Sequence, residues 1–382
     1  MKVANNVPKL RFPEFKDDWK RRKLGDVFEQ TTFFVNPRVS DIELWSLTVE
    51  DGLTPKSERY NREFLVKKDD IFKEVRPGDI VYNPMNMTLG AIGYNGMEKS
   101  VAVSGYYVTM FAKENYNTNF IKTWLKSPQA IKLYKTHATG SLIEKQRVQF
   151  PTLSIISVAF PEYKEQKKIG YLFDIIDNLI ILHKCKCDKL KEYKKGCLQK
   201  MFPRGDADVP EVRFPGFTGA WERRKLSDET KNIDTGKSKF IVNSSGEYEI
   251  LGSTSVIGYD DNYDYEGDFL LTARVGANAG ELYRHSGKVK ISDNTVFIQG
   301  EHIDFTYYLL MNFDIKRLSF GTGQPLVKSS ELKGLELLFP SLSERDKIGA
   351  FFVNLDNLIA LHQRECEKYK ELKKGLLQQM FV

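Results

Sequence analysis

A 43-residue segment occurs twice in the chain without a gap. Residues 160–202 and 339–381 are identical at 24 of the 43 positions. In both copies apolar residues recur at alternating steps of four and three, the period of a coiled-coil seam. The repeat therefore predicts two helices of roughly 38 residues each, beginning near residues 165 and 344 and ~57 Å long.

Two helices of equal length in one chain can bury their seams on each other. This arrangement favours an antiparallel pair with a pseudo-two-fold axis between them; the alternative is two ordinary amphipathic core helices. The expected seam residues are Ile169, Phe173, Ile176, Ile180, His183, Ile348, Phe352, Leu355, Ile359 and His362. We expect His183 and His362 to approach each other where the helices cross, as polar seam residues rather than as metal ligands.

A second repeat precedes each long helix at a distance. RFPEFKDDWKRRKLGD at 11–26 and RFPGFTGAWERRKLSD at 213–228 share 10 of 16 residues. The order of front motif, variable stretch and long helix thus occurs twice in the chain. The boundaries that follow are 1–159 for the first domain, 160–202 for the first helix, 203–338 for the second domain with 203–212 as a linker, and 339–382 for the second helix.

The variable stretches have turn motifs at corresponding positions although their sequences differ. A Gly-Asp turn leads into an apolar strand at 76–86 and again at 265–275. Strands rich in Val, Ile, Tyr and Phe are mixed with shorter helical segments such as 119–134, which indicates an α/β fold. The predicted fold class is therefore two α/β domains joined by two long antiparallel helices. A shared frame with different loops is typical of recognition modules.

Searches for catalytic chemistry yield only incomplete motifs. DTGKS at 234–238 resembles a phosphate loop, but Lys231 stands where the first glycine is required. Asn83-Pro84-Met85 lacks the second proline and the aromatic residue of the amino-methyltransferase signature. The four cysteines, Cys185, Cys187, Cys197 and Cys366, fit neither a disulfide framework nor a zinc site. We expect reduced thiols, no metal, no cofactor bound by this chain and no catalysis by it.

The charge distribution favours nucleic acid as a partner. The net charge is +6, and a basic balance promotes contact with phosphates. Residues 1–159 carry 24 Lys and Arg against 18 Asp and Glu, whereas 203–338 carry 16 against 21. The second domain must therefore contact nucleic acid through a local patch.

Candidate base-reading residues are the Arg, Lys, Asn, Gln, Ser, Thr and Tyr side chains of the variable loops. In the first domain they are Asn83, Asn86, Thr88, Tyr106, Tyr107, Ser141, Lys145, Gln146 and Arg147; in the second they are Arg274, Asn278, Tyr283, Arg284, Asn294, Gln324, Lys328 and Ser329. Any one of them could instead be an ordinary solvated loop residue, so the two sets carry the prediction.

The repeated basic run requires a different interpretation. Identical residues cannot distinguish two different half-sites, so residues 20–23 and 222–225 are assigned to phosphate positioning or to the shared frame. Trp19 and Trp221 are expected to be core or docking anchors.

Together, the two front motifs and the FP-x3-E-x2-KIG-x2-F-x3-DNLI helices resemble the specificity subunit of type I restriction-modification systems over essentially the whole chain. The resemblance implies two target-recognition domains, each reading one half of a bipartite DNA site in the major groove, with the helices setting the separation. It also implies docking of two methyltransferase subunits and, through them, two motor-nuclease subunits. S-adenosylmethionine, ATP and Mg²⁺ are then expected on those partners.

The alternatives are a scaffold that spaces two protein-binding modules without DNA, and a standalone methyltransferase, which the missing cofactor loop disfavours. No apolar stretch suits a membrane span and the N-terminus lacks an apolar signal core, so a cytoplasmic location is expected.

Overall fold

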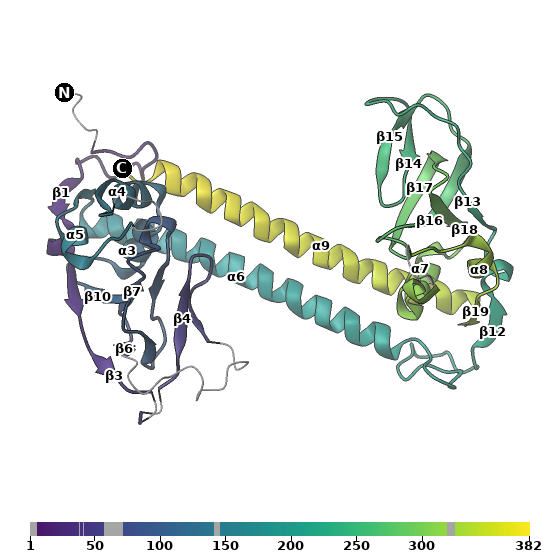
Figure 1. Cartoon of the computed structure of the whole chain (residues 1–382), viewed down its shortest axis with the longest axis horizontal. Coiled ribbons are helices and arrows are strands. Elements are labelled where there is room, and N and C mark those ends of the chain that lie inside the picture. The colour runs from purple at the N-terminus through teal and green to yellow at the C-terminus, as the bar shows by residue number, and fades with distance from the viewer. Residues whose placement is uncertain (1–5, 38, 41, 57–71, 141–145, 319–324) are drawn as a thin grey trace. The chain divides into compact units, whose positions relative to one another are not determined.

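The structure is a computed structural model that describes residues 6–37, 39–40, 42–56, 72–140, 146–318 and 325–382. It divides by compactness into two units (Figure 1). Unit 1 comprises Met1–His183 and Glu365–Val382, and unit 2 comprises Lys184–Arg364. Each unit thus contains one variable domain together with part of both long helices, and each is described by itself.

Unit 1 is built on a four-stranded antiparallel sheet. In spatial order its strands are β2 (Phe28–Thr31), β10 (Val108–Ala112), β7 (Ile80–Tyr82) and β8 (Ile92–Tyr94). Helices α3 (Thr118–Leu125) and α4 (Pro128–His137) contribute to the same core. Their N-caps are Asn117 and Ser127, whose side chains accept the N–H groups of Phe120 and Ala130.

Smaller elements complete unit 1. They are β1 (Lys20–Lys23) paired with β11 (Ser157–Phe160), β3 (Phe34–Val35) with β6 (Phe72–Val75) and β9 (Val101–Ser104), β4 (Trp45–Thr48) with β5 (Gly52–Pro55), and the short helices α1 (Leu24–Val27) and α5 (Phe150–Ser154).

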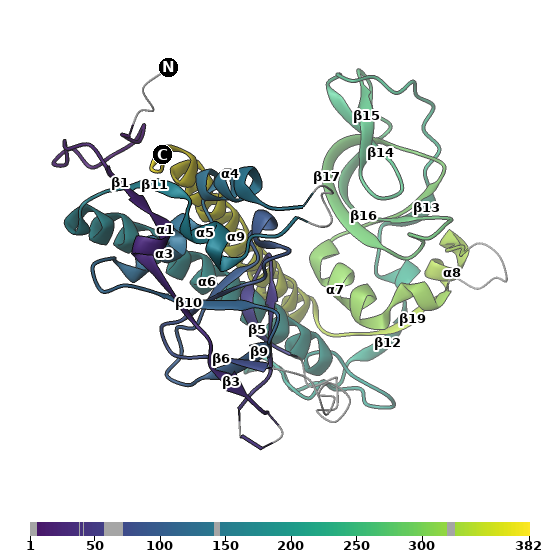
Figure 2. The same cartoon turned by 60° about the vertical axis from the view of Figure 1, so that its left-hand side comes forward.

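Unit 2 is built on a six-stranded sheet, most of whose strands are labelled in Figure 2. In spatial order its strands are β13 (Asn232–Thr235), β18 (Thr295–Gln299), β16 (Tyr265–Ala273), β17 (Leu282–Ile291), β14 (Tyr248–Leu251) and β15 (Val256–Asp260). Only the β14–β17 pair among these is parallel. The remaining elements are β12 (Glu222–Lys225) paired with β19 (Glu336–Phe339), and helices α7 (Ile303–Phe313) and α8 (Ser329–Lys333).

The two units share one frame. The order β2-β10-β7-β8 in unit 1 corresponds to β13-β18-β16-β17 in unit 2, and β1–β11 corresponds to β12–β19. The stretch between the first and third frame strands differs: β3 to β6 form separate small sheets in unit 1, whereas β14 and β15 extend the main sheet in unit 2. The repeated sequence therefore encodes the frame, and the divergent sequence encodes what is added to it.

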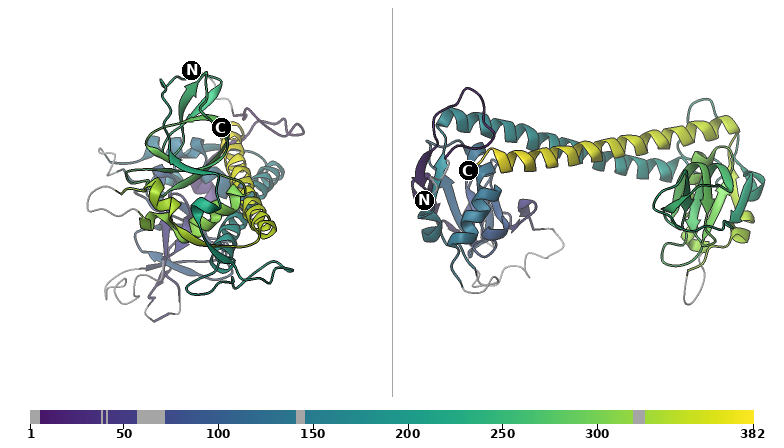
Figure 3. Two further views of the ribbon diagram at one scale, coloured as in Figure 1. Left: turned by 90° about the vertical axis from the view of Figure 1, so that its right-hand side faces the viewer. Right: turned by 90° about the horizontal axis from the view of Figure 1, so that it is seen from above.

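The long helices are α6 (Tyr163–Lys200) and α9 (Leu342–Gln379), each of 38 residues. In unit 1 Lys373 of α9 pairs with Asp177 of α6 at 2.5 Å, and in unit 2 Lys194 of α6 pairs with Asp356 of α9 at 2.6 Å. Within each unit the start of one helix packs against the end of the other, so the pairing is antiparallel, as predicted (Figure 3).

The apolar seam is buried towards the start of each helix. Ile169, Phe173, Ile176, Ile348, Phe352, Leu355 and Ile359 are buried, while Ile180, His183 and His362 are half-buried. The His183 ring packs against Tyr369, with ring centroids 5.6 Å apart. His183 and His362 belong to different units, and their mutual approach stays a prediction.

Each unit is completed by the residues that directly follow one of the long helices, after α9 in unit 1 and after α6 in unit 2. In unit 1 Phe381 packs against Trp19, Phe120 and Phe173, with centroids 5.7–6.5 Å apart. In unit 2 Phe202 packs against Trp221, Phe305 and Phe352 at 5.9–6.0 Å. Both tryptophans are 2% exposed, so they are core residues.

The front motif holds the helix ends in place. The Arg11 guanidinium donates to both carboxylate oxygens of the fully buried Glu165, at 2.7 and 2.8 Å. The Leu10 N–H donates to the Gln379 carbonyl at the end of α9. Unit 2 repeats both contacts, with Arg213 donating to Glu344 and Val212 to the Lys200 carbonyl. The motif is written twice because each unit needs the same clamp.

The basic run that follows lies on exposed strands. All residues of β1 and β12 are exposed. In β12, Arg224 is paired with Glu222 and Glu229, and these contacts within the protein hold the pKa of the Arg224 guanidinium above its usual value. Arg224 is therefore engaged by two carboxylates of unit 2.

Candidate nucleic-acid interface

In unit 1 the loop that follows β7 carries several of the predicted polar side chains. The Asn83 side chain accepts the Met85 N–H at 3.0 Å, and the Asn83 N–H donates to the Ala91 carbonyl at 3.1 Å. Asn83 is half-buried and Thr88 is buried, whereas Asn86 is exposed. Asn83 therefore shapes the loop and Asn86 is the side chain that a ligand could reach.

A second segment lies beside this loop. The Val148 N–H donates to the Pro84 carbonyl at 3.0 Å, and Arg147 and Thr139 exchange two backbone hydrogen bonds. The exposed Arg147 guanidinium lies over the Tyr106 ring, 5.8 Å from its centroid. Gln146 is half-buried, and Ser141 and Lys145 lie outside the described residues. The fold thus brings Tyr106 and Arg147 together and bonds the Arg147 segment to the loop that carries Asn86.

The Tyr106 ring is carried by a turn that a buried lysine supports. The Tyr107 N–H donates to the Ser104 carbonyl at 3.0 Å, and Lys73 Nζ donates to the Tyr107 carbonyl at 2.6 Å. Lys73 is 9% exposed, and burial lowers the pKa of its ammonium group. The half-buried Tyr107 therefore helps to anchor the turn, and Tyr106, which is 42% exposed, is its accessible ring.

The lowered pKa of Lys73 leads to a testable expectation. Its charged form is less favourable in the fold than in water, so Lys73→Met should leave the unfolding free energy of unit 1 within about 1 kcal/mol of wild type, or raise it. Amide hydrogen exchange at residues 104–107 should nevertheless accelerate, because the turn loses its clamp. Lys73→Arg, which keeps a donor, is the control. A loss of more than about 2 kcal/mol in Lys73→Met would contradict this role.

In unit 2 a corresponding set gathers where β16 ends and β18 begins. The Arg274 N–H donates to the Asn294 carbonyl at 2.9 Å, and the Val327 N–H donates to the Arg274 carbonyl at 2.8 Å. Arg274, Asn278, Asn294 and Lys328 are all exposed. Lys328 has a partner in Glu331, 3.5 Å away, and that pair is solvent-exposed.

The two sets occupy the same place in the frame. The bond from Val327 to Arg274 in unit 2 matches the bond from Val148 to Pro84 in unit 1, since β7 and β16 are equivalent strands. The same backbone position is thus held by Pro84, within an Asn-containing loop, in unit 1 and by Arg274 in unit 2. Equivalent positions that carry different side chains can contact different base edges.

Other predicted residues are engaged within unit 2. Arg284 forms an ion pair with Asp304, and its guanidinium lies 4.6 Å from the centroid of the Tyr307 ring. The half-buried Tyr283 donates its hydroxyl to the Gly252 carbonyl. Ser329 is half-buried at the start of α8, and Gln324 lies outside the described residues. Neither Arg284 nor Tyr283 presents its polar group freely to a ligand.

Residues 253–255 escaped the sequence-based prediction. They form the turn between β14 and β15, and Ser253 Oγ donates to the Asn294 carbonyl at 3.1 Å. The only signal was the short Gly-Ser-Thr-Ser run at 252–255, which by itself predicts a turn and no function.

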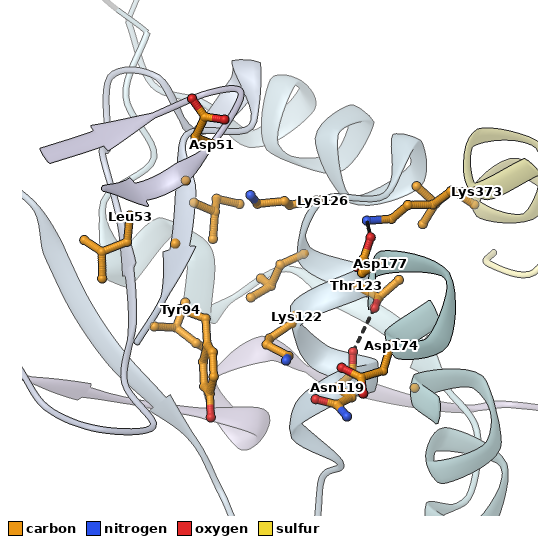
Figure 4. Close-up of a pocket in the computed structure, with 17 residues that line it drawn as sticks. Asp51, Leu53, Tyr94, Asn119, Lys122, Thr123, Lys126, Asp174, Asp177 and Lys373 are labelled. Atoms are coloured by element: carbon orange, nitrogen blue, oxygen red, sulfur yellow. Dashed lines mark hydrogen bonds and ion pairs between the residues drawn. The ribbon is translucent and has the colours of Figure 1, made fainter. Parts of the chain in front are cut away.

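A separate pocket of about 290 Å³ lies in unit 1 among β5, β8, α3, α6 and α9 (Figure 4). Lys122, Lys126 and Lys373 line it together with Asp51, Asp174 and Asp177. Lys373 is paired with Asp177, and the Lys122 ammonium lies 4.8 Å from the centroid of the Tyr94 ring. Burial, with the charge of Lys373, lowers the pKa of Lys126. The pocket's charges balance, so it does not favour phosphate binding.

Among the described residues, no group of three or more His, Cys, Asp or Glu side chains is placed to hold a metal ion. Within the same part of the chain, no helix is both long and apolar enough to cross a membrane.

Comparisons with known proteins agree with the presence of two repeats in the chain. The family model "Type I restriction modification DNA specificity domain" matches residues 16–192 and again 219–371. The chain is 24% identical to the type I restriction enzyme MjaVIII specificity subunit of Methanocaldococcus jannaschii, over 96% of this chain and 92% of that protein. It is 22% identical to the putative MjaX specificity subunit of the same organism, over 97% and 95%.

A solved structure shares the fold. The S subunit of a type I restriction-modification system from M. genitalium matches with a TM-score of 0.70 and 14% identity, over 98% of this chain and 99% of that one. The predicted fold class is confirmed. Because the family model covers most of the chain in two matches, this protein belongs to the family of type I restriction-modification DNA specificity subunits.

Proposed function

We propose that the chain gives a type I restriction-modification complex its DNA sequence specificity, with each α/β domain reading one half of an asymmetric bipartite site through the major groove. The observation that carries the proposal is that equivalent surfaces of the two units carry different polar side chains. Unit 1 presents Asn86, Tyr106 and Arg147. Unit 2 presents Arg274, Asn294 and Lys328 at the matching place.

These side chains suit base edges. Arginine and lysine pair with guanine, asparagine pairs with adenine, and each well-placed bidentate contact is worth about 1–3 kcal/mol of discrimination. The exposed basic strand β1, identical in part to β12, suits phosphates, which set register without specifying sequence.

The long helices support the second half of the proposal. The antiparallel helices connect the two domains, and half-sites on one face of a duplex recur about every 10–10.5 base pairs. In this proposal α6 and α9 set the separation between half-sites. Methyltransferase subunits dock on the chain and bring S-adenosylmethionine, and motor-nuclease subunits bring ATP and Mg²⁺. The chain itself catalyses nothing.

Methylome sequencing of cells that express the chain with its methyltransferase partner tests the proposal. We expect a methylated site in two unlike parts separated by a fixed number of unspecified bases. Replacing residues 1–158 by the corresponding domain of another family member should change one half-site and leave the other intact. A change in both halves, or in neither, would contradict modular reading.

Salt dependence distinguishes DNA reading from a scaffold that binds no DNA. The assembled complex should lose affinity for its target duplex steeply as salt rises, because phosphate contacts release counterions. The measurement is the slope of log affinity against log salt concentration for the complex with its methyltransferase. No retention on DNA at low salt would favour the scaffold.

A further inference from the structure

The turn at residues 252–255 connects β14 to β15 at the edge of the unit 2 sheet (Figure 2). The Gly252 N–H donates to the Ser255 carbonyl at 2.9 Å and closes the turn. Thr254 and Ser255 are exposed, and Ser253 is half-buried. The turn therefore holds two hydroxyl side chains in solvent on a tightly defined backbone.

One carbonyl oxygen joins this turn to the candidate surface of unit 2. The Asn294 carbonyl accepts the Ser253 hydroxyl at 3.1 Å and the Arg274 N–H at 2.9 Å. The Ser292 N–H, two residues earlier, donates to the Leu251 carbonyl at 3.0 Å. The turn thus has its place fixed relative to Arg274 and Asn294.

Tyr283 supports the turn from beneath. It lies on β17, which pairs in parallel with β14, and its hydroxyl donates to the Gly252 carbonyl. Its ring packs against the apolar cluster of Leu251, Phe269 and Ile291. Burial raises the pKa of the phenol, so Tyr283 stays protonated and keeps donating throughout the physiological range.

We propose that the 252–255 turn is a specificity-determining element of unit 2, in which Thr254 and Ser255 contact base edges and Tyr283 is the positioning residue. Serine and threonine hydroxyls both donate and accept, so they fit several base edges in the major groove. Among the described residues the equivalent stretch of unit 1 forms separate small sheets, whereas in unit 2 the turn joins two strands of the main sheet. This inference rests on the proposed function and names residues of the same reading surface.

The test uses the full chain with its methyltransferase partner and methylome sequencing as the readout. In the double variant Thr254→Ala, Ser255→Ala, at least one position of the second half-site should lose discrimination by roughly tenfold or more. The first half-site should remain as specific as in the wild type, which also reports that the variant folds and assembles.

Tyr283→Phe removes only the hydroxyl that holds the turn. We expect it to lower base discrimination at the same position as the double variant. Combining all three substitutions should lower discrimination at that position no further. A tyrosine with a merely structural role would lower methylation evenly across sites without changing base preference, and that result would overturn the positioning role.

Ser244→Ala, Ser245→Ala is the matched control. These exposed serines precede β14, at the opposite end of the strand from the turn, and their loss should leave the motif unchanged. If the wild-type chain directs methylation of a two-part motif and the Thr254→Ala, Ser255→Ala variant directs methylation of the same motif, the inference is overturned and the proposed function stands. A wild-type chain that directs no two-part methylation would overturn both.

Discussion

Replacing Arg11 by methionine should lower the free energy of unfolding of unit 1 by about 3–5 kcal/mol. Glu165 is fully buried and Arg11 is 11% exposed. The substitution therefore leaves a buried carboxylate without its bidentate partner, at a site from which water is excluded. Denaturant unfolding of the full chain, with amide hydrogen exchange to assign the loss to unit 1, is the measurement.

Matched variants distinguish the loss of a buried ion pair from the loss of an exposed one. Lys99→Met breaks an exposed pair with Glu43, in which the side chains are 60% and 48% exposed, and should change stability by no more than about 1 kcal/mol. The double variant Arg11→Met, Glu165→Leu should recover most of the loss, because it leaves no uncompensated charge. Arg213→Met should transfer the effect to unit 2. An Arg11→Met chain as stable as the wild type would show that the clamp is dispensable.

Replacing Phe381 by alanine should also cost about 3–5 kcal/mol, and the loss should appear in unit 1. Phe381 is 3% exposed and packs on Trp19, Phe120 and Phe173. Its removal leaves a cavity in the middle of an aromatic cluster. Hydrogen exchange should therefore accelerate in the core around Trp19, although the substituted residue is the last but one of the chain.

Two variants control for position. Leu372 lies on α9, shortly before Phe381, but is 48% exposed, so Leu372→Ala should change stability by no more than about 0.5 kcal/mol. Phe202→Ala makes the equivalent change at the end of α6, and its loss should fall in unit 2. If Phe381→Ala left exchange around Trp19 unchanged, the C-terminus would not be part of the unit 1 core.

The helices were predictable because their signal is local. The 3.5-residue period lies within each segment, and the observed starts at Tyr163 and Leu342 fall two residues before those expected. The α/β character was predictable for the same reason, since β-branched and aromatic runs between turns occur within short windows.

The composition of each unit was not predictable to the same degree. The sequence-based boundaries assign 339–382 to a single helical segment, yet its last 18 residues, Glu365–Val382, belong to unit 1 by compactness. No local pattern tells that Met380 and Phe381 complete a core begun at Trp19, because the partners are separated by most of the chain.

The residues of the candidate surface were likewise predictable only in part. Residue type selected Asn86, Arg147, Arg274 and Asn294, which are exposed, but equally selected Arg284, whose ion pair with Asp304 depends on which face of β17 it occupies. The turn at 252–255, whose role is a proposal, was not among the predicted residues, since its proximity to Asn294 arises only when β14 pairs with β17.

By itself, the sequence determined the repeated frame, the two long helices and the kind of side chain available for reading DNA, because periodicity and residue chemistry are properties of neighbouring residues. Only the tertiary structure decided that each unit is closed by the far end of a helix. It also decided which polar groups remain free for a ligand, because both outcomes depend on contacts between residues far apart in the chain.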